Sequence, residues 1–512
     1  MSQPYYPPPP PPTQPYYSQP AQQQYYPPQT GGYSPVPPPA YEQGSFRGSI
    51  AEKWNPKPKY QDLWAILLFL AHLVGFVILS YFGLKFLISQ RALERNDSFF
   101  RPEIIPPFII SGVIGLILSV AYMFFMQRFP LPLIKVTLYL SIAMYFVAAL
   151  VFFFFARNFI LAIIFVVFGI LYLIAAFSWR NRIPFAAVML ETVVSITRKY
   201  YGIVVMGFIG LVIQVGWSVL WILSLIGAYE YFRPQFCTTT NSITATGNTT
   251  RTSCSISLYL ILVYLLFSFY WTSQVIKTIV HVTASGVYAT YYFLEGTTQG
   301  TGTTPTLSSF KRATTTSIGS ICFGSLIIAL LNTARAVLRT FADSDDGACG
   351  FLACCIACLL AWIESLVEYF NFYAYVQVAI YGKSYCQAAK DTWTLIKDRG
   401  VEAIINDDLI GNVLTMGSLL IGVLCGLLGF LYINYFLKPL LTDQNNTTLI
   451  IIFVIICFAI GFMMCVVITD AITSGVSTTF VALAEDPDAL RRTKPVLFEK
   501  IRQQWPRVVQ GI

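Results

Sequence analysis

Long apolar blocks of about 20 residues recur along this chain, and they limit the folds it can adopt because that length crosses a bilayer as a helix. Almost no charge separates the apolar residues within a block, which excludes a large soluble core. The strands of a transmembrane barrel would alternate instead of running apolar throughout. The blocks lie near 64–84, 106–126, 133–155, 158–178, 204–227, 257–277, 317–340, 351–380, 410–436 and 449–470. The sequence therefore predicts an all-α, polytopic membrane protein with about ten transmembrane helices.

Both ends of the chain are expected on the cytosolic side. Ten spans place the two termini on one side, and Lys and Arg are concentrated in the tails and the even-numbered loops. The first 60 residues lack the apolar region of a cleavable signal peptide, so the first span would direct insertion. We expect a disordered Pro/Tyr/Gln-rich tail over 1–60, a ten-span domain over 61–484 and a C-terminal tail over 485–512. The net charge of +8 arises in the tails and beside the spans, and it does not indicate nucleic-acid binding.

The odd-numbered loops carry features of an extracytoplasmic compartment. Glycosylation sequons, which are predicted sites, begin at Asn96, Asn248, Asn445 and Asn446. Cys237 and Cys254 share loop five with Asn248, and an oxidising compartment would allow them to form a disulfide; two unpaired thiols are the alternative. Arg335 and Arg339 stand at the outer end of span seven, which leaves open a re-entrant pair of spans seven and eight with a cytosolic loop.

The expected cytosolic segments contain one recognition motif and two amphipathic stretches. Pro38, Pro39 and Tyr41 form a PPxY sequence, the pattern that WW domains read; a chance match in a proline-rich tail is the alternative. On a cytosolic tail, WW-domain ubiquitin ligases would be the partners. Residues 180–202 and 383–407 mix basic and apolar residues at helical spacing, which predicts helices lying on the membrane surface.

Block eight contains the strongest candidate site. Its acids, Glu364 and Glu368, lie in an otherwise apolar and aromatic run, where an ionised carboxylate costs about 2.5–3.5 kcal/mol on insertion scales. At helical spacing they share one face with Asn371 and Tyr375. Aromatic faces and carboxylates suit an organic cation. The candidate substrate-binding residues are Trp362, Glu364, Glu368, Tyr369, Asn371, Tyr373, Tyr375 and Asp470.

The depth of these acids depends on where the spans end. If span eight ends near Leu366, its glutamates are interfacial; if it continues through Tyr381, they lie near mid-membrane, which the unbroken aromatic run favours. Asp470, near the end of block ten, is either at membrane depth or interfacial.

Metal and cofactor chemistry have no support in the sequence. His72 and His281 are isolated, and the cysteines from Cys349 to Cys358 lack zinc-finger spacing. There is no Walker A sequence, dinucleotide fingerprint or nucleophile elbow, so we expect no cofactor and no enzyme.

Three stretches resemble the choline transporter-like family: SIGSICFGSL (317–326), EYFNFYAYVQVAIYGKSYCQAAKDTW (368–393) and TSGVSTTFVALAEDP (473–487). The similarity extends from about residue 64 to the end of the chain. The short first extracytoplasmic loop, the PPAY tail and INDDLI (405–410) resemble the fungal pH-nine-sensitive branch; the large glycosylated first loop of animal members is missing. The resemblance implies ten spans, cytosolic termini, a plasma-membrane location and solute transport.

The leading hypothesis is a transporter of a small organic solute, such as choline or a related cation, by a facilitated or gradient-driven mechanism. A membrane adaptor that recruits ubiquitin ligases through its PPxY tail is the alternative from another class. A channel or lipid scramblase is the third. Membrane lipids surround the protein in each case.

Overall fold

The computed structural model describes residues 59–91, 106–244, 247–297, 300–342, 347–437 and 446–506. Within these residues, ten helices are long and apolar enough to cross a membrane, which confirms the predicted polytopic helical class. These ten are α2 (Leu63–Arg91), α3 (Pro106–Arg128), α4 (Pro130–Phe154), α5 (Phe159–Trp179), α7 (Gly202–Phe236), α8 (Ile256–Leu294), α10 (Ile318–Ala342), α11 (Gly347–Tyr381), α12 (Tyr385–Tyr432) and α13 (Asn446–Glu485). Shorter helices are α6 (Ile183–Lys199), α9 (Pro305–Thr314), α14 (Pro487–Thr493) and α15 (Pro495–Gln504), and a π-helical turn, η2 (Ile433–Leu437), follows α12.

Helix α5 shows how so apolar a sequence packs. Its buried residues are small, Ala162, Gly169 and Ala176, and they recur at every second turn of the helix. Small residues let two helices approach closely in a membrane, and α5 packs on α4 through them. Large side chains such as Phe168 and Ile174 are exposed, which suits contact with lipid.

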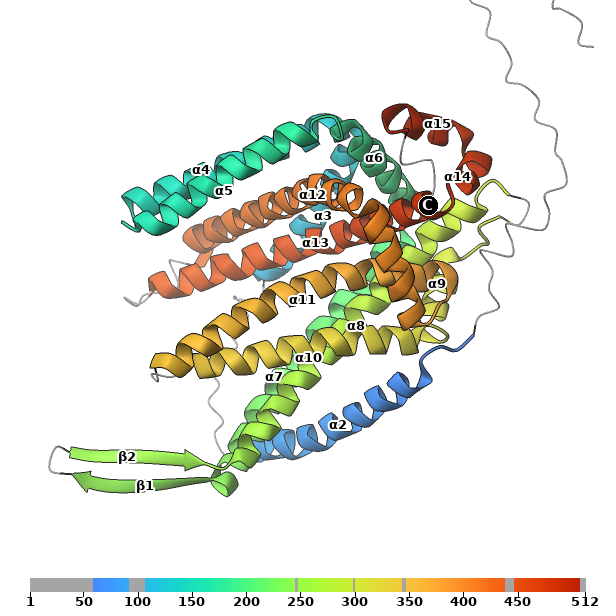
Figure 1. The fold of residues 1–512 in the computed structure, drawn as a ribbon. Helices are drawn as coiled ribbons and strands as arrows, with labels where there is room; N and C mark the ends of the chain where they lie inside the picture. The colour runs from blue at the N-terminus through green and yellow to red at the C-terminus, as the bar shows by residue number, and fades with distance from the viewer. Residues whose placement is uncertain are drawn as a thin grey trace, which may run out of the picture. The chain divides into compact units, whose positions relative to one another are not determined.

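The core of the bundle lies around α8, α12 and α13. Helices α12 and α13 pack along each other and against α3, and α8 contacts α7, α10, α11 and α13. Helices α4 and α5 form an antiparallel hairpin that contacts α12, and α10 and α11 form another (Figure 1). Helix α2 packs mainly on α7.

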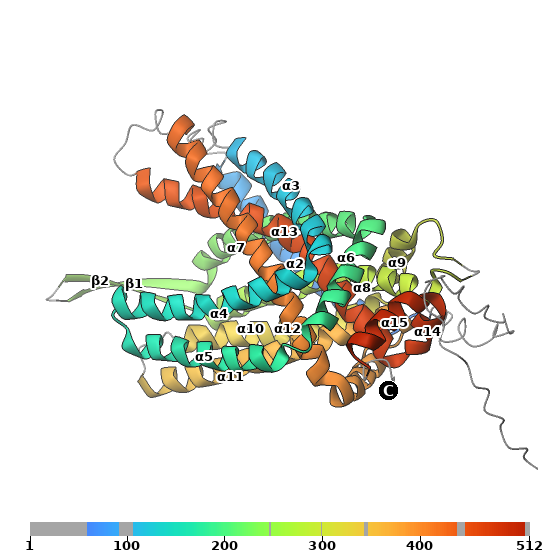
Figure 2. The ribbon, with the colours of Figure 1, turned by 90° about the horizontal axis from the view of Figure 1, so that it is seen from above.

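The connections separate into two ends of the bundle. Strands β1 (Cys237–Thr244) and β2 (Gly247–Cys254) form an antiparallel hairpin at one end, whereas α9, α14 and α15 lie at the other (Figures 1 and 2). The joined ends of α10 and α11 lie at the hairpin end, and each of these helices is long and apolar enough to cross a membrane. The hairpin adds a small sheet to the predicted all-helical class, in a loop whose many threonines favour strands.

The two amphipathic stretches predicted over 180–202 and 383–407 differ in the structure. Residues 183–199 form the separate helix α6, whose apolar face, including Met189 and Leu190, is buried in the main core. The predicted helix over 383–407 is present from Tyr385, but it does not end there, because α12 continues from Tyr385 into span nine without a break. No proline interrupts this segment, so the backbone hydrogen bonds of the helix continue.

Candidate functional site

A cavity of about 430 Å³ lies near the middle of the bundle, between α7, α8 and α13. Phe372 of α11 completes its wall. Its charged lining residues are Lys277, close to the middle of α8, and Asp470, close to the middle of α13. Charges at this depth are costly in hydrocarbon and typically mark substrate or ion pathways.

An ion pair at the cavity joins α8 to α11. Lys277 Nζ lies 2.9 Å from Glu368 Oε1. The Lys277 and Glu368 side chains are 63% and 45% exposed, and Asp470 is also exposed, so protein atoms do not enclose these three groups. Two carboxylates face one ammonium here, which leaves one negative charge. The site is therefore suited electrostatically to a cation.

One wall of the cavity is a hydrogen-bonded histidine. His281 Nε2 donates to the Phe372 carbonyl at 3.0 Å, and Nδ1 lies 2.8 Å from the Ser474 hydroxyl. The Phe372 ring stacks on the imidazole with centroids 4.1 Å apart. The Ser474 hydroxyl oxygen also lies 2.9 Å from the Asp470 carbonyl oxygen. These contacts hold α8, α11 and α13 together around the charged groups.

The opposite wall is formed by α7 at close range. Gln214 donates to the Ser273 hydroxyl at 2.8 Å and links α7 to α8. At Gly207 and Gly210 an added Cβ would lie 2.8 Å from Val467 and 2.5 Å from Val280. Only glycine permits this approach, so α7 stays close to both neighbours.

Glu364 does not join this cavity. Helix α11 runs through Tyr381, and Glu364 is its middle residue, as the deeper of the two predictions required. Its carboxylate pairs with Arg335 of α10 at 2.5 Å, and both side chains are largely enclosed. Trp362 is 64% exposed and contributes no ring to the cavity lining.

Asn371 and Tyr375 are buried against α10. Asn371 donates to the Gly324 carbonyl at 3.3 Å and accepts a hydrogen bond from Tyr385. Tyr375 lies 3.3 Å from the Ser325 hydroxyl. These side chains connect helices and do not line the cavity.

Tyr369 and Tyr373 face another acid. Their hydroxyls donate to the same oxygen of Asp407, at 3.1 and 2.6 Å. The structure thus distributes the predicted set over separate locations. Asp470 lines the cavity, and Glu368 is joined to it through Lys277.

Lys277, His281 and Phe372 were missed by the sequence reasoning. Block six was taken to end at residue 277, where hydropathy falls. The helix continues to Leu294, so Lys277 is internal. A lone lysine beside an apolar block was the available signal.

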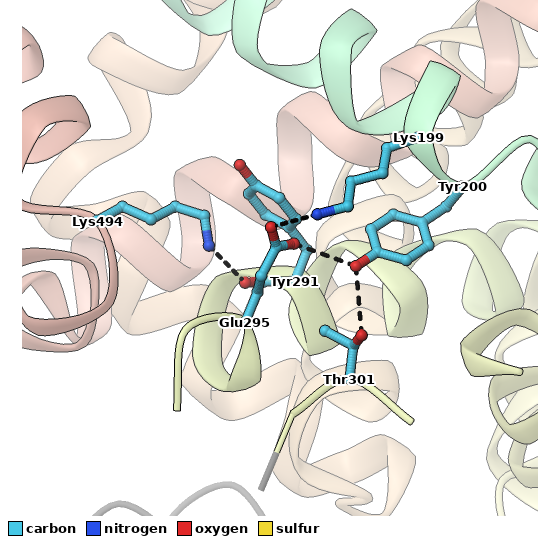
Figure 3. Close-up of polar contacts among 6 residues, drawn as sticks. All are labelled: Lys199, Tyr200, Tyr291, Glu295, Thr301 and Lys494. Atoms are coloured by element: carbon cyan, nitrogen blue, oxygen red, sulfur yellow. Dashed lines mark hydrogen bonds and ion pairs between the residues drawn. The ribbon is translucent and has the colours of Figure 1, made fainter. Parts of the chain in front are cut away.

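A polar cluster ties the shorter helices to α8 (Figure 3). Glu295 accepts hydrogen bonds from Lys199 at 2.5 Å and Tyr200 at 3.1 Å, and the bond to Glu295 raises the pKa of Lys199. Lys494 donates to the Tyr291 carbonyl at 3.0 Å, with its ammonium 3.7 Å from the Tyr291 ring. Burial lowers the pKa of Lys494 to about 8. These contacts hold α6 and the C-terminal helices on the end of α8.

The other predicted sites fall in three places. Cys237 and Cys254 form a disulfide that closes the base of the β-hairpin. Asn248 lies in β2, and Asn446 is the first residue of α13. Asn96, Asn445 and the PPxY residues Pro38, Pro39 and Tyr41 lie outside the described residues. Among the described residues, no group of His, Cys, Asp and Glu is arranged to hold a metal ion.

Within the described residues, ten helices that can cross a membrane and a charged cavity among them define a multi-pass membrane protein. Residues 163–488 match the family model described as plasma-membrane choline transporter. The chain belongs to the choline transporter-like family, in its fungal pH-nine-sensitive branch. Membership in this family suggests a membrane transporter and not an enzyme.

Curated fungal relatives match most of the chain. Protein PNS1 of Mycosarcoma maydis is 37% identical over 479 residues, which cover 91% of this chain and 87% of the relative. Protein PNS1 of Gibberella zeae is 34% identical over 480 residues, with 91% and 86% covered. Protein pns1 of Aspergillus fumigatus is 34% identical over 489 residues, with 93% and 89% covered.

Proposed function

We propose that this protein carries a small organic cation, such as choline or a related ammonium compound, across the plasma membrane. The observation that carries the proposal is the mid-span cavity lined by Lys277 and Asp470, at which Lys277 also pairs with Glu368. An entering cation neutralises the remaining negative charge and gains attraction in a low dielectric. The description of the matching family model as plasma-membrane choline transporter supports both the substrate class and the location.

The cavity suggests how one cation is held. Asp470 supplies the charge that Lys277 leaves uncompensated, and the Phe372 ring offers an aromatic face. Lys277 also discourages a second cation by repulsion. No nucleotide-binding motif is present in the sequence, so transport proceeds by facilitation or is driven by a gradient.

The test is an uptake panel with the full chain in proteoliposomes. Labelled choline and ethanolamine should enter saturably, and uncharged glycerol should not. Asp470→Asn should reduce choline uptake at least about tenfold, the equivalent of ~1.4 kcal/mol of lost attraction. Asp398→Asn is the matched control, since Asp398 is exposed on α12 and remote from the cavity lining.

Two results would contradict the transporter proposal. Full choline uptake by Asp470→Asn would show that choline does not bind in this cavity. Flux that does not saturate would indicate a channel or scramblase.

The PPxY sequence supports a second role, the recruitment of a WW-domain ubiquitin ligase. Tyr41 would fill the aromatic groove of such a domain, and Pro38 and Pro39 would preset the extended backbone. Tyr41→Ala should abolish pull-down by an isolated WW domain and leave choline flux intact. Unchanged pull-down would show that the PPxY sequence does not bind the WW domain, whereas lost flux would show that the tail is needed for transport itself.

A further inference from the structure

A second cavity, of about 350 Å³, lies between α4, α5 and α12. It shares no lining residue with the central cavity. Its aromatic lining residues are Tyr145 of α4 and Phe165 and Tyr172 of α5. The Tyr145 ring lies 5.9 Å from that of Tyr172 and 6.4 Å from that of Phe165, measured between centroids. The three rings therefore form a continuous aromatic wall.

Asp408 of α12 places a carboxylate opposite these rings. The Tyr172 hydroxyl donates to Asp408 Oδ2 at 3.1 Å, and the Asn412 amide donates to Tyr172. Ser141 donates to Asn412 Oδ1 at 3.1 Å. This chain of hydrogen bonds joins all three helices and holds the carboxylate and the Tyr172 ring in position.

The negative charge at this cavity has no basic partner among the described residues. None of the side chains that line the cavity is basic, and none of the ion pairs between described residues includes Asp408. The preceding residue, Asp407, is also acidic and accepts its hydrogen bonds from Tyr369 and Tyr373 on the other side of α12. Two adjacent carboxylates thus lie together in a membrane-spanning segment, and neither forms an ion pair with a described residue.

We propose that this cavity is a second binding site, for an alkylammonium group, formed by Asp408 and the rings of Tyr145, Phe165 and Tyr172. Aromatic faces and a carboxylate are the groups that hold such cations, which have few or no N–H donors. An anion would be repelled by Asp408, and a hydrocarbon chain would leave the carboxylate unpaired in an apolar environment. The site lies apart from the proposed transport cavity and does not depend on it.

The alkylammonium group can come from two sources. One is a free small cation. The other is the headgroup of a choline lipid, because α4 and α5 expose apolar side chains such as Val147 and Phe168 to the bilayer. Asp408 is close to the beginning of its span, Ile404–Tyr435, near the level of lipid headgroups.

The test measures equilibrium binding of labelled tetramethylammonium to the purified full chain in nanodiscs of phosphatidylglycerol. Asp470→Asn serves as the background, so that binding at the central cavity is weakened. One binding event should remain, and adding Asp408→Asn should weaken it at least about tenfold. Tyr145→Leu should weaken it several-fold, whereas Tyr145→Phe, which keeps the ring, should not. Repeating the titration in phosphatidylcholine nanodiscs identifies the source, because a lipid occupant lowers the measured affinity and a free cation leaves it unchanged.

Asp398→Asn in the same background is the control for the loss of one carboxylate on α12. Size-exclusion profiles and melting temperatures show whether each variant is folded. Equal affinity in the Asp470→Asn protein with and without Asp408→Asn would overturn the proposal. Failure of Asp470→Asn to alter binding or uptake would instead count against the central cavity, so the two proposals fail separately.

Discussion

Glu364 and Glu368 lie one helical turn apart on α11, and their surroundings differ. Glu364 pairs with Arg335 at 2.5 Å, and the two side chains are only 14% and 26% exposed. Glu368 forms an exposed pair with Lys277 at 2.9 Å, beside a cavity that Lys277 and Asp470 line. One acid and one base form a closed neutral pair, whereas two acids and one base leave a charge for a ligand. Partner number and access therefore separate a structural carboxylate from a binding carboxylate.

The largest effect on stability is expected at the closed pair. Glu364→Gln leaves Arg335 charged and unpaired among packed helices, which should cost about 3–5 kcal/mol of folding free energy. The melting temperature in detergent and the amount of protein at the cell surface should both fall. Adding Arg335→Gln should restore most of the loss, since it removes the stranded charge. A stable Glu364→Gln protein would show that the pair is not enclosed.

The exposed pair of Glu368 and Lys277 should instead affect transport and leave folding stability unchanged. Glu368→Gln should abolish saturable uptake, a loss of about tenfold or more, without lowering surface expression. Lys277 still has Asp470 beside it in the cavity, so its charge is not left without a carboxylate. Proteoliposome uptake and surface labelling measure the two quantities on the same variant. Full uptake by Glu368→Gln would remove the distinction between the two glutamates.

The sequence predicted the spans well because the signal is local. A helix of about 20 apolar residues is recognisable from composition alone. The high cost of an ionised carboxylate in hydrocarbon pointed to Glu368 and Asp470, since each is an acid inside an apolar block. It could not separate Glu364 from Glu368, because their partners lie on different helices.

Features that depend on long-range packing were missed. Lys277 meets Glu368 across 91 positions of the chain, and no local pattern encodes that contact. Residues 278–294 are too polar to extend an apolar block, yet tertiary contacts bury them within α8. Trp362 and Tyr375 showed the same aromatic signal, and only the packing reveals that one is exposed and the other buried.

The smallest effect is expected at Lys494, a partly buried lysine that forms no salt bridge with a described residue. The hydrogen bond to Glu295 raises the pKa of Lys199, whereas burial lowers the pKa of Lys494 to about 8, below the usual value of 10.5. Between these two pH values the unfolded chain binds more protons at Lys494, so this group's contribution to stability increases with pH and is lost as the pH falls through 8. Melting temperatures between pH 7 and 10.5 should therefore show a smaller increase, or a larger decrease, for Lys494→Met than for the unchanged protein. Lys311→Met, which removes a lysine from α9, is the control. Parallel curves for Lys494→Met and the unchanged protein would show that Lys494 titrates as an ordinary surface lysine.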